Sequence, residues 1–202
     1  MSRFWKISLL LLFVYAAVSQ WQQRGVKVYG QESITPHQPI QHILRASEAP
    51  EFQVKNYQLK AQASYRIEAR LLRRENYRFG REAELSPVDF ALGWGPMAAN
   101  SLLDQLTITQ SNRFYWLRWQ ELSVPTSVVM QHSANTHIIP ADKYVAKNID
   151  AMRPGQVVEL EGYLVNVRST DGWYWNTSLT RNDTGAGACE LFWVESARVM
   201  ER

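Results

Sequence analysis

Cysteine is almost absent from this chain, which has 202 residues and a single cysteine, Cys189. One cysteine excludes an intramolecular disulfide and every metal site that needs several thiolates. The fold must therefore be held together by packing. Eight tryptophans, nine tyrosines and seven phenylalanines are available for that purpose, and each large ring removes ~150 Å² or more from water when it is buried.

A strong excess of positive charge is also missing. The formal net charge is +3, and Arg3 and Lys6 near the start supply two of these charges, so the remainder is almost neutral. Proteins that bind nucleic acid usually carry a basic patch for the phosphates. The only dense basic cluster is interrupted by Glu75 and Glu82, and we therefore expect no nucleic-acid partner. It consists of Arg70, Arg73, Arg74, Arg78 and Arg81.

The first 21 residues, MSRFWKISLLLLFVYAAVSQW, form the one long apolar run. A bilayer-spanning helix needs about 20 such residues, and Trp5 and Trp21 bracket the run as interfacial anchors do. Arg3 and Lys6 place the N-terminus in the cytoplasm by the positive-inside rule. We expect a cytoplasmic tip at residues 1–6 and an uncleaved signal anchor, a single transmembrane helix, at residues 7–21.

A cleaved signal peptide is the alternative, because small residues near Ala17 and Ser19 offer a cleavage site. In that case the chain is secreted. Both interpretations export the remainder of the chain. Residues 22–50 have the glycine, proline and glutamine content of a linker, and residues 51–202 are predicted to form a single exported β-rich domain.

Alternating apolar and polar residues at 57–71 predict a strand. The stretch SPVDFALGWGPM begins with Ser86 and Pro87, which favour the start of a short helix. Further helices are predicted at 99–106 and 141–152.

The remaining segments read as strands. TITQSNRFYWLRWQ predicts a strand pair or one bent strand, and GWYWNTS and CELFWVESARVM predict two more. In QVVELEGYLVNVRS the apolar face changes near Gly162, which is typical of a bent strand in a small barrel of the oligonucleotide/oligosaccharide-binding (OB) type. The predicted class is α+β, mainly antiparallel β, with an OB-like barrel half and a few short helices after one transmembrane helix.

Three stretches, ELSPVDFALGWGPM, QHSANTHIIPA and SLTRNDTGAGACELFWVE, resemble the signature stretches of a family of uncharacterised bacterial proteins. Members of that family are short membrane-anchored or exported chains. The resemblance implies a location in the bacterial cell envelope, at the inner membrane if the anchor is retained. It implies no activity.

HSANTHIIPA contains the two histidines that lie outside the predicted linker, His132 and His137. A spacing of five does not bring two imidazoles together on a helix or a strand, so we interpret the stretch as a turn. No metal or cofactor is expected. With the GWGP turn and the TRNDTGAGACE loop, this turn would build a polar site. The candidate residues are His132, Ser133, Asn135, His137, Arg181, Asp183, Thr184 and Cys189.

Two interpretations of that site remain open. A histidine could deprotonate the Cys189 thiol while Asn135 orients the imidazole, as in nucleophilic catalysis. Alternatively, Cys189 is a small core residue, and Ser133 and Asn135 only cap the turn.

Four tryptophans could form a stacking platform for sugars or bases, and core packing is the alternative. They are Trp94, Trp116, Trp173 and Trp175. The sequence thus predicts a membrane-anchored envelope protein that acts as a binding or accessory module for an envelope protein or a glycan. The alternative is a hydrolase or transferase that uses His132 or His137 with Asp183 or Cys189.

Overall fold

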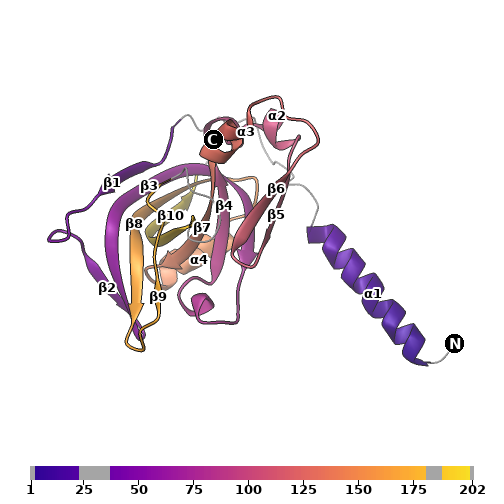
Figure 1. The fold of residues 1–202 in the computed structure, drawn as a ribbon, viewed down its shortest axis with the longest axis horizontal. Coiled ribbons are helices and arrows are strands. Elements are labelled where there is room, and N and C mark those ends of the chain that lie inside the picture. Colours follow the sequence, from indigo (N-terminus) through magenta and orange to yellow (C-terminus); the bar gives the residue numbers. More distant parts are fainter. Residues whose placement is uncertain (1–2, 23–36, 181–187, 201–202) are drawn as a thin grey trace.

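The computed structural model describes residues 3–22, 37–180 and 188–200. It is a mixed α+β structure dominated by antiparallel strands (Figure 1). The strands are β1 Ile40–Ile43, β2 Glu51–Val54, β3 Tyr57–Asn76, β4 Val88–Gly93, β5 Thr107–Ser111, β6 Phe114–Arg118, β7 Ser133–Pro140, β8 Val157–Ser169, β9 Tyr174–Trp175 and β10 Glu190–Val199. The α-helices are α1 Arg3–Gln22, α2 Asn100–Leu103, α3 Thr126–Gln131 and α4 Lys143–Ala151, with short 3₁₀ turns at Glu82–Glu84 and Gly95–Ala98.

Five strands pair in a closed ring. β3 pairs with β4, β4 with β7, β7 with β10, β10 with β8, and β8 with β3 again. Only the β7–β10 pair is parallel. β1 and β2 extend the sheet along the first half of β3, β9 pairs with the end of β8, and β5 and β6 form a separate hairpin.

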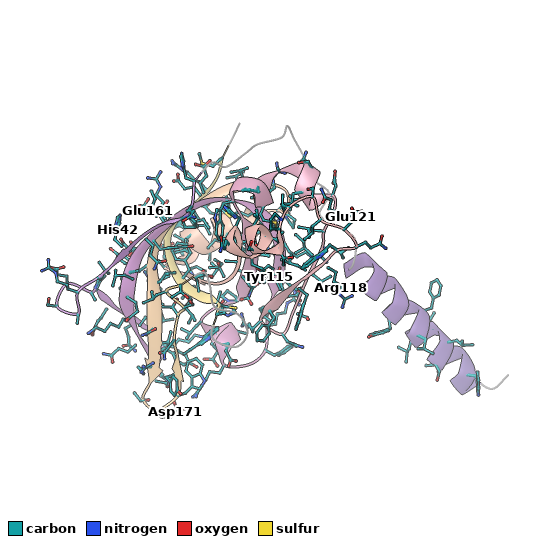
Figure 2. The ribbon with its side chains drawn as sticks, turned by 45° about the horizontal axis from the view of Figure 1, so that its top comes forward. His42, Tyr115, Arg118, Glu121, Glu161 and Asp171 are labelled. Carbon is teal, nitrogen blue, oxygen red and sulfur yellow. The ribbon has the colours of Figure 1, made fainter. Side chains whose placement is uncertain are left out.

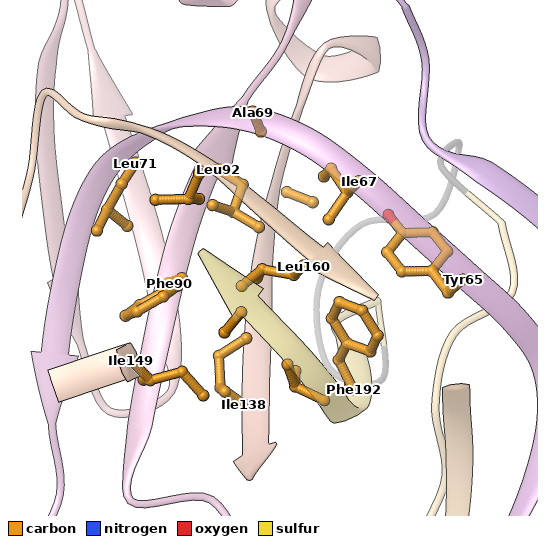
Figure 3. Close-up of a cluster of buried hydrophobic side chains, with 14 of the residues drawn as sticks. Tyr65, Ile67, Ala69, Leu71, Phe90, Leu92, Ile138, Ile149, Leu160 and Phe192 are labelled. Carbon is orange, nitrogen blue, oxygen red and sulfur yellow. The ribbon is translucent and has the colours of Figure 1, made fainter. Parts of the chain in front are cut away.

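The interior of the ring holds the main hydrophobic core (Figure 3). Inward-facing side chains from every strand of the ring meet there, and α4 adds Val145 and Ile149. Each valine, leucine, isoleucine or phenylalanine among them stabilises the fold by ~1.5–3 kcal/mol when it is fully buried. The members labelled in the figure are Tyr65, Ile67, Ala69, Leu71, Phe90, Leu92, Ile138, Ile149, Leu160 and Phe192.

Two smaller clusters pack elsewhere. We call the first the β9-side cluster: it contains Tyr57, Leu59, Leu85, Ile139, Val165, Val167, Leu191 and Trp193, with Trp173 and Trp175 packed against it. We call the second the hairpin-side cluster: it contains Leu72, Ala91, Met97, Leu102, Leu103, Leu106, Ile108 and Val129, with Tyr115 and Leu117 packed against it.

Several predicted elements are confirmed. The alternating segment 57–71 lies in β3, residues 107–120 contain the β5–β6 hairpin, and α4 falls within the helix predicted at 141–152. The predicted helix at 99–106 is reduced to α2. β9 and β10 form within GWYWNTS and CELFWVESARVM.

The change of apolar face at Gly162 also has a structural counterpart. Gly162 has φ +156°, and a Cβ there would lie 2.0 Å from the Trp193 carbonyl oxygen. The register of β10 shifts between Val194 and Ser196 at the same level. Leu164, two residues after Gly162, still packs in the main core, while Val165 and Val167 on the opposite face of β8 pack in the β9-side cluster.

Two local predictions are wrong for one physical reason. SPVDFALGWGPM forms strand β4 instead of a helix, and HSANTHIIPA forms strand β7 instead of a turn. All residues of β4, and all of β7 except Pro140, are buried. A strand that is covered on both faces loses the alternation that identifies strands in a sequence.

One strand of the sheet lies within the range predicted as linker. β1 lies within the expected linker 22–50 and pairs with β3 between Ala63 and Arg66. Among the described residues, the sheet begins at Ile40.

Helix α1 stands apart from the sheet (Figure 1). Its apolar side chains from Ile7 to Tyr15 are 48–75% exposed where they are large. Within the described residues, no helix is both long enough and apolar enough to cross a membrane.

Candidate functional site

A group of buried polar side chains lies on the outer face of β7, and we call it the polar seam. Ser133, Asn135 and His137 share this face of β7, followed by Ile139 of the β9-side cluster. The seam therefore runs from the hairpin-side cluster, through Tyr115, to the β9-side cluster. Its other members are Asp89, Gln110, Arg113, Tyr115 and Cys189.

Arg113 occupies the two-residue turn of the β5–β6 hairpin. Asn112 and Arg113 have φ values of +51° and +69°, the signature of a type I′ turn. Positive φ is uncommon for a residue as large as arginine. The contacts of its side chain and backbone explain why it is held there.

The Arg113 guanidinium neutralises a fully buried carboxylate. Its Nη1 lies 2.7 Å from Oδ1 of Asp89, which has 0% exposure, and its Nη2 donates to the Ser86 carbonyl at 2.9 Å. The guanidinium also lies 3.7 Å from the centre of the Tyr77 ring. Because a buried charge without a partner is very costly, this contact ties the hairpin tip to β4.

Tyr77 completes the Arg113 contact. Its hydroxyl accepts a hydrogen bond from the Arg113 backbone N–H at 2.9 Å. Burial, followed by the negative charge of Asp89, raises the pKa of Tyr77 to about 12. The phenol is therefore neutral at physiological pH.

His137 of β7 lies opposite Asp89 of β4 and contacts the same carboxylate oxygen as Arg113. Its Nδ1 is 2.9 Å from Asp89 Oδ1, and its ring packs against Trp175 with centroids 4.8 Å apart. His137 is only 3% exposed. Neither His137 Nδ1 nor the other carboxylate oxygen, Asp89 Oδ2, has a hydrogen-bond partner among the described residues.

Asn135 joins the hairpin to Cys189. Its amide nitrogen donates to the Arg113 carbonyl at 2.9 Å and lies 3.7 Å from Cys189 Sγ. Its amide oxygen accepts from Gln110 at 2.7 Å. The partly exposed thiol of Cys189 also lies 3.8 Å from the Arg113 carbonyl.

The hairpin-side end of the seam contains Ser133. Its hydroxyl donates to the Val129 carbonyl at 2.8 Å and lies 3.1 Å from the Tyr115 hydroxyl. Burial is the main cause that raises the pKa of Tyr115.

His132 does not belong to the seam. It caps α3, its Nδ1 lies 2.7 Å from the Val128 carbonyl, and its own carbonyl accepts from the Trp94 N–H at 3.0 Å. His132 and His137 therefore lie in separate sites. The GWGP segment is joined to the start of β7 by the hydrogen bond from the Trp94 N–H to the His132 carbonyl.

The other predicted site residues have varied positions. Arg181, Asp183 and Thr184 lie outside the described residues. In the described part of the chain, no group of three or more His, Cys, Asp or Glu residues could hold a metal ion.

The four tryptophans do not share one surface. Trp94 is 1% exposed in the main core, whereas Trp116 on β6 is 53% exposed. Trp173 and Trp175 lie together at the β8–β9 hairpin, with ring centroids 6.1 Å apart. Figure 2 shows Asp171 at the end of this hairpin.

Sequence reasoning missed Asp89 and Arg113, the two charged residues on which the seam depends. A signal existed for Asp89, which is the single charge in the apolar run VDFALG and must therefore find a buried partner. Arg113 lies 24 residues away along the chain, and only the turn geometry brings it to Asp89.

Comparison with known proteins adds no family to this picture. No protein-family model, no curated protein and no solved structure matches the chain.

Proposed function

We propose that this chain is a membrane-anchored binding or accessory module of the bacterial cell envelope. The observation that carries the anchoring is the exposed apolar surface of α1 between Ile7 and Tyr15. A continuous apolar surface of this kind is unfavourable in water. Residues 1–21 would place it in the inner membrane, with Arg3 and Lys6 on the cytoplasmic side.

The exported domain supports a binding role. The ring β3–β4–β7–β10–β8, with α4 packed into its core, favours a small barrel of the OB type, a scaffold that commonly presents ligand sites on its surface. The polar side chains of the seam are largely engaged with each other. An envelope protein or a glycan is the proposed partner.

Fractionation of bacteria that express the full chain tests the anchor. We expect the protein in the membrane fraction after alkaline carbonate washing, and in solution only after detergent. Replacing Leu10 and Leu11 by lysine should abolish membrane retention, because two charges in the span are costly. The matched control is Ile43→Lys, an exposed apolar position in β1.

The mass of the purified protein decides between the two forms of export. An intact N-terminus supports the signal anchor, whereas loss of residues up to about Ser19 supports a secreted protein. Recovery of the wild-type chain from the soluble cytoplasm would contradict both.

One observation favours a second candidate, a hydrolase or transferase that uses Cys189. The 2.9 Å distance between Asp89 Oδ1 and His137 Nδ1 places a carboxylate beside an imidazole, as in the pairs that orient a general base, but His137 Nδ1 makes no hydrogen bond among the described residues. Cys189 directly precedes β10, whose Leu191 pairs with His137 of β7, and its Sγ lies 3.7 Å from the amide nitrogen of Asn135, two residues before His137. The near-complete burial of His137 speaks against this candidate.

Alkylation of Cys189 by iodoacetamide across pH 5–10 distinguishes the two candidates. An activated thiol should react with an apparent pKa below ~8.5 that rises in His137→Gln. A binding module should give the same pH profile in both proteins. His132→Gln is the control, because His132 lies outside the seam.

A further inference from the structure

We propose that an open pocket on the outer face of β3 and β8 binds a sugar that carries a carboxylate. The pocket has a volume of about 350 Å³ and lies beneath the segment that joins β1 to β2. Its size is at the lower end of the range for small-molecule sites. Its lining residues are Leu44, Ala46, Ala49, Glu51, Gln58, Lys60, Ala61, Gln62, Asn166 and Arg168.

The floor of the pocket is a polar ladder on two paired strands. Gln58 of β3 lies opposite Arg168 of β8, and Lys60 lies opposite Asn166. Residues opposite each other in a sheet share a face. The alternate residues of these strands, including Leu59 and Val167, point to the β9-side cluster and make the floor rigid.

The wall of the pocket is fixed at both ends. The Leu44 N–H donates to the Gln62 carbonyl at 2.9 Å, and the Ala61 N–H donates to the Pro50 carbonyl at 2.9 Å. Between these bonds, Ala46 and Ala49 leave room for a ligand because their side chains are small. The site is therefore preformed, which lowers the entropic cost of binding.

The charges of the lining favour a ligand with one negative charge. Lys60 Nζ lies 3.2 Å from Glu51 Oε1, so these two charges compensate each other. Arg168 contacts the Asn176 side-chain oxygen at 2.7 Å and its neighbour's carbonyl at 2.9 Å, and it forms no ion pair within the described residues. A guanidinium in this position is suited to a carboxylate, which it can bind through two parallel hydrogen bonds.

The other lining groups favour a sugar. Gln58 offers amide donors and an amide acceptor, which match hydroxyl groups. The Gln62 nitrogen already donates to the Lys60 and Ala61 carbonyls, so Gln62 offers its amide oxygen. The Asn166 oxygen already accepts from the Thr177 N–H, so Asn166 offers its amide N–H groups. The aliphatic side chains, such as Leu44, can contact the C–H face of a pyranose ring. The lining contains no aromatic side chain on which a nucleobase could stack.

Matched pairs of sugars test the charge requirement on the detergent-solubilised full chain. The probes are glucuronic acid against glucose, and N-acetylmuramic acid against N-acetylglucosamine, with binding followed by calorimetry or ligand-observed NMR. We expect each acid to bind about tenfold or more tightly than its neutral partner, because even one of the two charge-assisted hydrogen bonds from Arg168 supplies a factor of about ten. Equal binding within a pair, or no binding of either acid, would overturn the proposal.

Variants locate the site. Arg168→Gln should reduce the affinity of each acid to that of its neutral partner and leave the neutral sugar unchanged, whereas Arg118→Gln, on the exposed end of β6, should change neither. Ala49→Trp should block all four sugars by filling the pocket. Unchanged acid binding in Arg168→Gln would place the sugar elsewhere. This inference rests on the proposed binding function, but fractionation and sugar titration fail independently of each other.

Discussion

Arg113 has the most consequential set of contacts of any single residue in the seam. Its guanidinium neutralises Asp89 and packs on the Tyr77 ring. Its backbone carbonyl accepts a hydrogen bond from the Asn135 amide, and its backbone N–H donates to the Tyr77 hydroxyl. It thereby connects the β5–β6 hairpin to both β4 and β7. Replacing Arg113 therefore also changes the contacts of Asp89, Tyr77 and Asn135.

Arg113→Ala should lower the free energy of unfolding by about 3 kcal/mol, because it leaves the carboxylate of Asp89 buried without its arginine partner. The double variant Arg113→Ala/Asp89→Asn should be more stable than Arg113→Ala alone, since it contains no buried carboxylate at this place. Urea unfolding of the wild type and both variants measures this. A change of less than ~0.5 kcal/mol in Arg113→Ala would refute the role we assign to the ion pair.

Tyr77 should contribute to the loss of folding stability at alkaline pH. Its pKa is raised from 10.0 to about 12 in the folded state by burial and then by Asp89. Between these values the folded state holds a proton that the unfolded state has lost, so stability falls as the pH rises from 10 to 12. Tyr77→Phe should be less stable than the wild type at pH 8, because the Arg113 N–H loses its acceptor.

The difference in the free energy of unfolding between the wild type and Tyr77→Phe should then become smaller as the pH rises to 12. Urea titrations at several pH values test this, and other tyrosines titrate in both proteins alike. A difference that stays constant from pH 8 to pH 12 would show that Tyr77 does not titrate as described.

At the scale of secondary-structure elements, exposure decided which elements could be predicted from the sequence. β3 has one solvated face along Gln58, Lys60 and Arg66, so its alternation is visible. β4 and β7 are covered by the main core on one face and by the hairpin or the seam on the other. Their sequences show no alternation of apolar and polar residues, so they cannot be identified as strands. A polar residue such as Asn135 then looks like a turn residue until its partners are known.

Gly162 offers an element-scale prediction. An added Cβ would lie 2.0 Å from the Trp193 carbonyl oxygen, so Gly162→Ala must separate β8 from β10. Gly172 also has a positive φ, +88°, but nothing lies within 4 Å of its Cβ position. Gly172→Ala should therefore cost only backbone strain of ~1–2 kcal/mol, whereas Gly162→Ala should cost more and lower the yield of folded protein. Thermal melts of the two variants compare them, and equal effects would contradict the close contact at Gly162.

At the scale of the whole molecule, the three apolar clusters share strands. β3 and β8 each supply side chains to the main core and to the β9-side cluster, and β4 joins the main core to the hairpin-side cluster. We therefore expect the folded domain to unfold in one cooperative transition, with tryptophan fluorescence and far-ultraviolet circular dichroism following the same curve.

Ile149→Ala in α4 should lower the free energy of unfolding by ~2–5 kcal/mol, because Ile149 is 1% exposed in the main core. Fluorescence and circular dichroism should report the same decrease. Ile43→Ala, at an exposed position in β1, should leave the free energy of unfolding within ~0.5 kcal/mol of the wild type. Two separate transitions would mean that the clusters are independent folding units.

The position of β10 between β7 and β8 has a consequence for synthesis. A chain made from its N-terminus presents β3, β4, β7 and β8 well before residues 190–199 emerge. Until then, β7 and β8 each keep an unpaired edge that can capture strands of other chains. The ring therefore cannot close before β10 is synthesised. The extent of aggregation should depend on how quickly β10 then pairs with β7 and β8.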